Sequence, residues 1–213
     1  MPKFDHHLHT NRYSPDSVID PLELIVRARD AGLDGVVITE HDVQWPEDEL
    51  RELAEHGRRH NVLVFSGAEI SAREGHFLVY GLPNLDDVPP GVALGDLLAA
   101  VKRCGAAVVA AHPFRWDQDF EAIVAEHGPV FDGLELVSNN VTPETRRRTE
   151  DLLRSQPMGV TGSSDGHDPE IVGCYYTELA DPIQSLADFV TAVRQGRGRP
   201  RHRKGAPQAS GPV

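Results

Sequence analysis

Short apolar runs alternate with longer amphipathic segments along the chain. The apolar runs are rich in β-branched residues and have the length of buried strands; they span 3–9, 35–41, 62–70, 76–82, 106–112, 133–139 and 158–165. The amphipathic segments have apolar residues at helical spacing; they span 21–32, 46–60, 93–105, 143–155 and 185–196. This alternation predicts an α/β fold with a mainly parallel sheet, either open and doubly wound or closed into a barrel.

Motifs for nucleotide cofactors and for a serine nucleophile are missing from these predicted strand ends. No G-x-G-x-x-G follows the first predicted strand, and G-x-x-x-x-G-K-[ST] occurs nowhere in the chain. The stretch "GSSDG" at 162–166 lacks the G-x-S-x-G spacing of a nucleophilic serine. The sequence therefore favours neither a nucleotide-cofactor fold nor a covalent serine mechanism.

Charge is unevenly distributed over the 213 residues, a length that suits one well-buried domain. The net charge is −12, yet segment 194–204 holds six of the 21 Lys and Arg residues and no acid. The preceding residues carry 15 basic and 33 acidic side chains, a charge of −18 that does not attract nucleic acid through its general field. We predict a domain over 1–196 and a disordered basic tail over 197–213, which serves as a solubilising end or, alternatively, as a nucleic-acid arm.

Cellular location and thiol chemistry follow from simpler features. No apolar run approaches the length of a membrane helix, and the first residues lack the apolar core of a signal peptide, so we expect a cytoplasmic protein without a membrane partner. The two cysteines, Cys104 and Cys174, lack C-x-x-C spacing. We expect both to be small buried apolar residues.

Polar side chains gather where the predicted strands end. They are His7, His9, Glu40, His41, Glu69, His112, Asn139, Asn140, Asp165 and His167. In α/β barrels the carboxyl ends of the strands meet at the edge where functional sites are built. Burying five histidines with two acids there would be costly without an ion, so the pattern predicts a metal site.

The spacing "FDHHLHT" at 4–10 supports that prediction. Because side chains alternate faces along a strand, Asp5, His7 and His9 share one face, and the two histidines lie about 6–7 Å apart along the strand. They can converge on one ion, with Asp5 as an acceptor for a histidine N–H behind it. His6 points to the opposite face, where we expect it to pack or to form a local hydrogen bond. Asp165 and His167 are also two positions apart, so a carboxylate and an imidazole again share one face.

The ordered series "DHHLHT", "SPDS", "ITEHD", "GAEIS…GHFLVYG", "AHP", "NN" and "GSSDGH" resembles the PHP (polymerase and histidinol phosphatase) superfamily over residues 3–196. The resemblance implies a distorted (β/α)7 barrel of the TIM type in a single domain, with two or three Zn, Mn or Fe ions at its mouth. It assigns His7, His9, Glu69 and Asp165 to a first ion. Glu69, His76 and His112 would hold a second ion, and Asp16, His41 and His167 a third.

Three positions depart from the family pattern or permit another interpretation. Glu40 stands where the family often has Asp, and we expect it to lie beside the ligands rather than among them. Asp16 is either a ligand or a turn residue after Pro15. His76 is either a ligand or a solvent-exposed histidine at the start of a strand.

The resemblance implies a metal-dependent phosphoesterase in which a metal-activated water attacks phosphorus. We expect Arg115, Asp165 and His167 to be the catalytic residues, with Arg115 contacting the phosphoryl oxygens or, alternatively, forming a loop salt bridge. Asn139 or Asn140 either orients substrate or forms a turn.

The expected partner is a small phosphorylated substrate such as a nucleotide or histidinol phosphate; no obligate protein partner is inferred. Alternatives are a 5′–3′ exonuclease-type activity on short oligonucleotides and a metal- or phosphate-binding barrel without turnover. An amidohydrolase is more distant, because Lys3, Lys102 and Lys204 are poorly placed to bridge metal ions.

Overall fold

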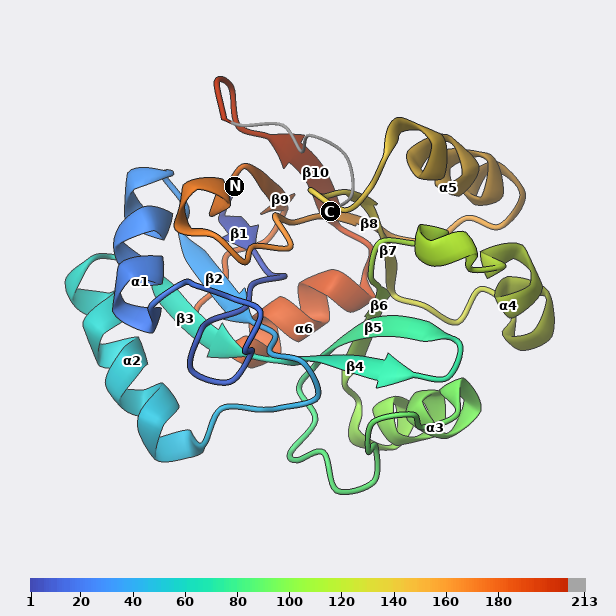
Figure 1. Ribbon diagram of the computed structural model, residues 1–213, viewed down its shortest axis with the longest axis horizontal. Coiled ribbons are helices and arrows are strands. Elements are labelled where there is room, and N and C mark those ends of the chain that lie inside the picture. Colours follow the sequence, from blue (N-terminus) through green and yellow to red (C-terminus); the bar gives the residue numbers. More distant parts are fainter. Residues whose placement is uncertain (207–213) are drawn as a thin grey trace.

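The strands of the computed structural model, which describes residues 1–206, pair into two five-stranded sheets (Figure 1). The first sheet has the order β10-β9-β1-β2-β3, formed by Gly198–His202, Tyr175–Leu179, Lys3–Asp5, Gly35–Ile38 and Leu63–Ser66. The second has the order β4-β5-β6-β7-β8, formed by Ala68–Ala72, Gly75–Tyr80, Ala107–Ala110, Gly133–Val137 and Val160–Gly162. The α/β class expected from the sequence is confirmed.

Both sheets are mixed, so the expectation of a mainly parallel sheet is wrong. β1, β2 and β3 run parallel, as do β6, β7 and β8. The hairpin β4–β5 is antiparallel at one edge of the second sheet, and β9 and β10 are antiparallel at one edge of the first. The predicted strand 62–70 divides at Gly67 into β3 and β4, which belong to different sheets. The seven-stranded barrel is not observed as such, because the hydrogen-bonded ladders do not close into a ring.

Two single bridges join the sheets where the strands end. Leu8, just after β1, pairs with Gly166, and His41, just after β2, pairs with Glu69 of β4. The backbone of His9 also donates to the carbonyl of Gly166 at 3.0 Å. The carboxyl ends of the parallel strands from both sheets therefore face one region, as expected for an α/β fold of this kind.

The helices of residues 1–206 pack on the outer faces of the sheets, except the last one, which lies between the sheets. They are α1 (Pro21–Asp30), α2 (Glu47–Arg59), α3 (Leu94–Cys104), α4 (Phe120–His127), α5 (Pro143–Ser155) and α6 (Leu186–Arg194). Five of them match predicted segments within a few residues. α4 was missed, because it has only eight residues and its buried positions Phe120, Ile123 and Val124 span little more than one turn. Short 3-10 turns lie at Arg115–Asp117 and Pro169–Ile171.

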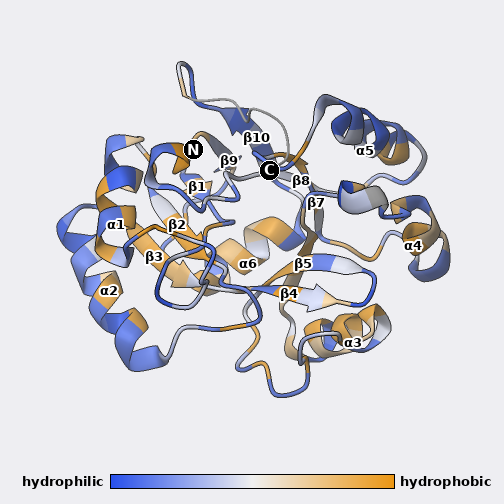
Figure 2. Cartoon of the chain, in the orientation of Figure 1, coloured by the Kyte–Doolittle hydropathy of each residue, from blue (hydrophilic) through white to orange (hydrophobic). Residues whose placement is uncertain are grey.

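Amphipathic packing holds the helices in place, and their polar faces point to solvent (Figure 2). α1 and α2 bury Leu24, Ile25 and Leu53 against the first sheet. α6 lies between the sheets and places Phe189 5.4 Å from the ring of Phe4, measured between centroids. None of the helices within residues 1–206 combines the length and apolar character needed to cross a bilayer.

The predicted cysteine environments are half correct. Cys174 is buried and burial raises the pKa of its thiol to about 12, as expected for an unreactive core residue. Cys104 is exposed at the last residue of α3, so the expectation that it is buried is wrong.

The predicted disordered tail is wrong over its first part. Residues 198–202 form β10, which pairs with all five residues of β9 in antiparallel register. Ion pairs explain how so basic a segment joins an acidic domain, since Arg197 contacts Asp181 at 2.8 Å and Arg201 contacts Glu178 at 2.8 Å. The remainder of the predicted tail, 207–213, lies outside the described residues.

Two truncations test the structural role of β10. A chain ending at residue 197 should lose roughly 2 kcal/mol or more of unfolding free energy relative to a chain ending at 206, because it loses a ladder of backbone hydrogen bonds. Urea unfolding of the two truncated chains measures the difference. Equal midpoints would show that β10 adds nothing to the fold.

Candidate metal centre

All nine predicted ligands meet where the two sheets face each other. They come from the end of β1, the following loop, the ends of β2, β6 and β8, and the hairpin β4–β5; the residues are His7, His9, Asp16, His41, Glu69, His76, His112, Asp165 and His167. Residues that are as far apart in the sequence as His7 and His167 thus contribute to one cluster.

The buried carboxylate of Glu69 lies at the centre of this cluster. Its Oε2 atom is 3.3 Å from Nε2 of both His7 and His9 and 3.0 Å from Nδ1 of His41. Its Oε1 atom is 2.9 Å from Nδ1 of His76 and 3.2 Å from Nε2 of His112. One carboxylate therefore contacts five imidazole rings, which are contributed by both sheets.

Asp165 provides the second buried carboxylate. Its Oδ1 atom is 3.2 Å from Nε2 of His7 and 3.6 Å from Nε2 of His9. Asn140 donates a hydrogen bond from its amide to Oδ2 of Asp165. Asn140 lies in the turn that follows β7, one of the two roles expected for it, and its side chain also orients a predicted ligand.

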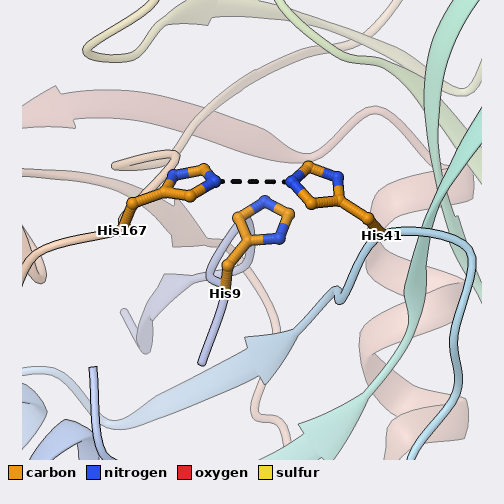
Figure 3. Close-up of side chains that lie close together, drawn as sticks. All are labelled: His9, His41 and His167. Atoms are coloured by element: carbon orange, nitrogen blue, oxygen red, sulfur yellow. Dashed lines mark hydrogen bonds between the residues drawn. The ribbon is translucent and has the colours of Figure 1, made fainter. Parts of the chain in front are cut away.

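Three histidines form an outer group at the more open side of the cluster (Figure 3). The Nε2 atoms of His41 and His167 face each other at 3.4 Å, and the His9 ring lies between and beneath them. Asp16 approaches both, with Oδ2 3.1 Å from His41 and 3.2 Å from His167. Asp16 therefore does more than form a turn, and His9 joins this group as well as the inner one.

His76 also lies within the cluster rather than in solvent. Its side chain is 25% exposed, and its Nδ1 contacts Glu69 at 2.9 Å. The hairpin β4–β5 explains this placement, because Ser71 pairs with His76 and brings the start of β5 back beside Glu69.

Electrostatics keep both carboxylates ionised in spite of their burial. Burial alone would raise the pKa of Glu69, but the neighbouring His7, His112 and His41 outweigh it and hold that pKa well below its usual range. The pKa of His7 is correspondingly raised by Asp165, Glu135 and Glu69 against the effect of burial. The centre therefore needs positive charge, which protons or cations supply.

Unpartnered buried atoms show that metal ions fit this charge requirement. Nε2 of His7, Nε2 of His9 and Oε2 of Glu69 are buried and have no hydrogen-bond partner, because their close contacts lack hydrogen-bond direction. Such atoms are costly unless they bind something. Imidazole nitrogens and carboxylate oxygens in overlapping sets of three suit Zn, Mn or Fe.

Glu135 fixes the orientation of two cluster members and was missed in the sequence. Its fully buried carboxylate accepts a hydrogen bond from Nδ1 of His7 at 3.1 Å, one from Ser163 at 2.7 Å and one from the backbone of His112 at 2.9 Å. These contacts direct Nε2 of His7 toward the cluster. The signal was available, since Glu135 is the one acid within the apolar run "GLELV".

Glu40 lies beside the ligands, as predicted. Its carboxylate accepts hydrogen bonds from Thr10, from Ser14 at 2.6 Å and from the Trp45 indole at 3.0 Å. Ser14 in turn lies 3.3 Å from Nδ1 of His9. Glu40 thus fixes the first loop and, through Ser14, the ring of His9.

Three further polar residues, Asp5, His6 and Asn139, have their hydrogen-bond partners outside the ligand cluster. Asp5 does not accept from a histidine, because its carboxylate turns to the backbone N–H groups of Ser164 and Gly173 at 2.9 and 2.8 Å. His6 lies on the opposite face, as expected, between Tyr80 and Thr177. Asn139 donates to the carbonyl of Ser164 and has a structural role.

Arg115 lies at the edge of the cluster. Its Nη1 atom is 3.9 Å from Oδ2 of Asp165, and its side chain is 20% exposed. Its buried Nε atom has no hydrogen-bond partner among the described residues. The side chain is therefore placed to offer donors to a ligand at the cluster.

An α/β domain with a cluster of histidines and carboxylates at its strand ends, which could hold metal ions, defines the class of this protein. A family model described as PHP-associated matches residues 143–197. An uncharacterised protein from Methanocaldococcus jannaschii is 30% identical over 122 residues, spanning 53% of this chain and 68% of that protein. The chain belongs to the PHP family, as the sequence motifs indicated.

Solved structures share the fold. A Bifidobacterium adolescentis protein assigned as a metal-dependent phosphoesterase has a TM-score of 0.60 and 22% identity, over 77% of this chain and 87% of that one. A lesion-specific endonuclease from Pyrococcus furiosus has a TM-score of 0.62 and 16% identity, over 91% of this chain and 56% of that one. At these identities the likeness concerns the fold alone.

The variant Glu135→Gln tests the orienting role of Glu135. Both carboxylate oxygens accept hydrogen bonds, so an amide must turn its NH₂ group toward a donor. Metal affinity should fall about 10- to 100-fold with the fold retained. Competition with a chelator measures the affinity, and Glu55→Gln, at a position 54% exposed on the surface, serves as the matched control. Equal affinities for the two variants would contradict the assignment.

Proposed function

We propose that this chain is a metal-dependent phosphoesterase that hydrolyses a small phosphate monoester. The observation that carries the proposal is the convergence of unpartnered buried donors from His7, His9 and Glu69 on one point. Sites of this composition hold hydrolytic metal ions. Among the relatives of similar fold are proteins described as a phosphoesterase and as an endonuclease, which also act on phosphate esters.

The ions would be held by three ligand sets, of which the first two share Glu69. The first is His7, His9, Glu69 and Asp165; the second is Glu69, His76 and His112; the third is Asp16, His41 and His167. Divalent ions bound there supply Lewis acidity, which lowers the pKa of water toward neutrality and offsets charge on phosphoryl oxygens.

The chain's own residues position the reacting groups. Arg115 directs its guanidinium donors at the phosphoryl oxygens, where they stabilise the charge that develops during displacement. Glu135 and Glu40 hold the rings of His7 and His9, and Asn140 holds Asp165. These contacts maintain the site in one arrangement before substrate binds.

A small substrate is favoured over an oligonucleotide by the state of the basic segment. Two of its arginines, Arg197 and Arg201, are paired with acids of the domain and contribute less to a field that would attract nucleic acid. Turnover of a 5′-phosphorylated oligonucleotide in preference to a nucleotide would support the exonuclease alternative instead.

Phosphate release tests the proposal. Protein loaded separately with Mn, Zn or Fe should release phosphate from some members of a panel of nucleotides, histidinol phosphate and a 5′-phosphorylated oligonucleotide. His9→Ala and Asp165→Ala should lower the rate at least about 100-fold, more than the loss of a residue behind a ligand costs. His60→Ala, which removes a histidine outside the cluster, should leave it unchanged.

The outcome that would contradict the proposal is equally defined. Metal bound in stoichiometric amounts without phosphate release from any substrate would favour a binding barrel without turnover. Release that persists in both ligand variants would place the activity elsewhere.

A further inference from the structure

One tryptophan lies on the surface beside the cluster. Trp116 is 66% exposed and is the aromatic member of the exposed large apolar side chains in residues 1–206. The other tryptophan, Trp45, is buried and donates its indole N–H to Glu40. Leaving a large aromatic side chain exposed to water is unfavourable. The position of Trp116 beside the cluster therefore indicates a ligand that covers its ring.

A pocket of about 280 Å³ connects Trp116 with the cluster. Arg115, Trp116 and Gln118 line it together with His76 and His112. The Trp116 ring centroid lies 5.1 Å from that of His76 and 5.5 Å from that of His112. A ligand group bound at these two histidines would therefore lie next to the indole ring.

Arg115 joins the indole to the acidic side of the site. Its guanidinium carbon lies 4.1 Å from the centroid of the Trp116 ring, and its Nη1 atom is 3.9 Å from Asp165. The guanidinium covers part of the ring, while the exposed remainder stays open to a second planar group.

The loop that carries Trp116 is tied to the hairpin that carries His76. Gln118 accepts from the backbone of Phe114 and donates to the carbonyl of Glu74. Gly75 makes this contact possible, since a Cβ atom there would lie 1.8 Å from Nε2 of Gln118. Phe114 and Trp116 both have left-handed backbone conformations, with φ of 68° and 54°. Such conformations are sparsely populated, and these contacts hold Trp116 at the mouth of the pocket.

We propose that Trp116 is a specificity-determining residue that stacks on a planar heteroaromatic ring of the substrate, so that the preferred phosphate esters are of the nucleotide class. The proposal rests on the phosphoesterase function proposed above. Aromatic side chains stack on any base because every base has a π-face, and an adjacent arginine adds a cation–π contribution. The site would accordingly distinguish substrates by the presence of a ring more than by its identity.

A substrate pair that differs only in the ring tests this assignment. AMP and ribose 5-phosphate share the sugar phosphate, and only AMP carries a base. In Trp116→Leu, kcat/KM for AMP should fall about 10-fold, the size expected for the loss of one base–aromatic stack, while the value for ribose 5-phosphate should stay within about twofold. Trp116→Phe should restore most of the AMP value. Equal losses for both substrates, or no loss for AMP, would overturn the proposal.

Tryptophan fluorescence separates this proposal from the proposed function. In the metal-free protein, AMP at millimolar concentration should quench the emission, whereas ribose 5-phosphate should not. In Trp116→Phe, where Trp45 is the remaining tryptophan of the two, AMP should cause no quenching. This result would support stacking of the base on Trp116 even if no ester were hydrolysed. Quenching that is absent in the unmodified protein, or unchanged in Trp116→Phe, would overturn it.

Discussion

The contact between the carboxylate of Glu69 and five imidazole rings is the interaction on which the rest of the structure depends. A carboxylate that is 1% exposed is costly to bury unless positive charge surrounds it. The rings come from β1, β2, β5 and β6 or their ends, so the charge requirement of one side chain gathers strands of both sheets. Divalent ions meet that requirement and also satisfy the buried nitrogen atoms that have no partner.

Backbone bridges and buried hydrogen bonds around Glu69 hold the histidine rings close to its carboxylate. The bridge between His41 and Glu69 joins the two sheets at the centre itself, and the bridge between Leu8 and Gly166 joins them beside it. Glu135 and Glu40 use further buried carboxylates to direct ligand rings. Polar groups at this edge are thus arranged in layers, with ligands inside and acceptors behind them, while apolar clusters stabilise the sheets elsewhere.

Much of the site could be predicted because it depends on local rules. Alternation along a strand places His7 and His9 on one face, and the end of each strand is marked by the change from apolar to polar residues. Asp16 and His76 were found only through the family resemblance, because a loop residue and a hairpin residue carry no such periodic signal. Alternation also placed Asp5 on the face of His7 and His9, but its carboxylate accepts hydrogen bonds from backbone N–H groups of distant loops and not from a histidine. The strand β10 was missed because its composition indicates disorder, while its stability comes from pairing with β9 and from acids elsewhere in the chain.

The most direct test of the account is the metal content of the protein after removal of bound ions with a chelator and reloading with Mn, Zn or Fe, measured by elemental analysis per chain. Two or three ions per chain are expected for the unmodified protein. Glu69→Gln should lose at least one ion, because this side chain contributes to two of the ligand sets. Less than one ion per chain, or an unchanged content in Glu69→Gln, would contradict a polynuclear centre built on Glu69.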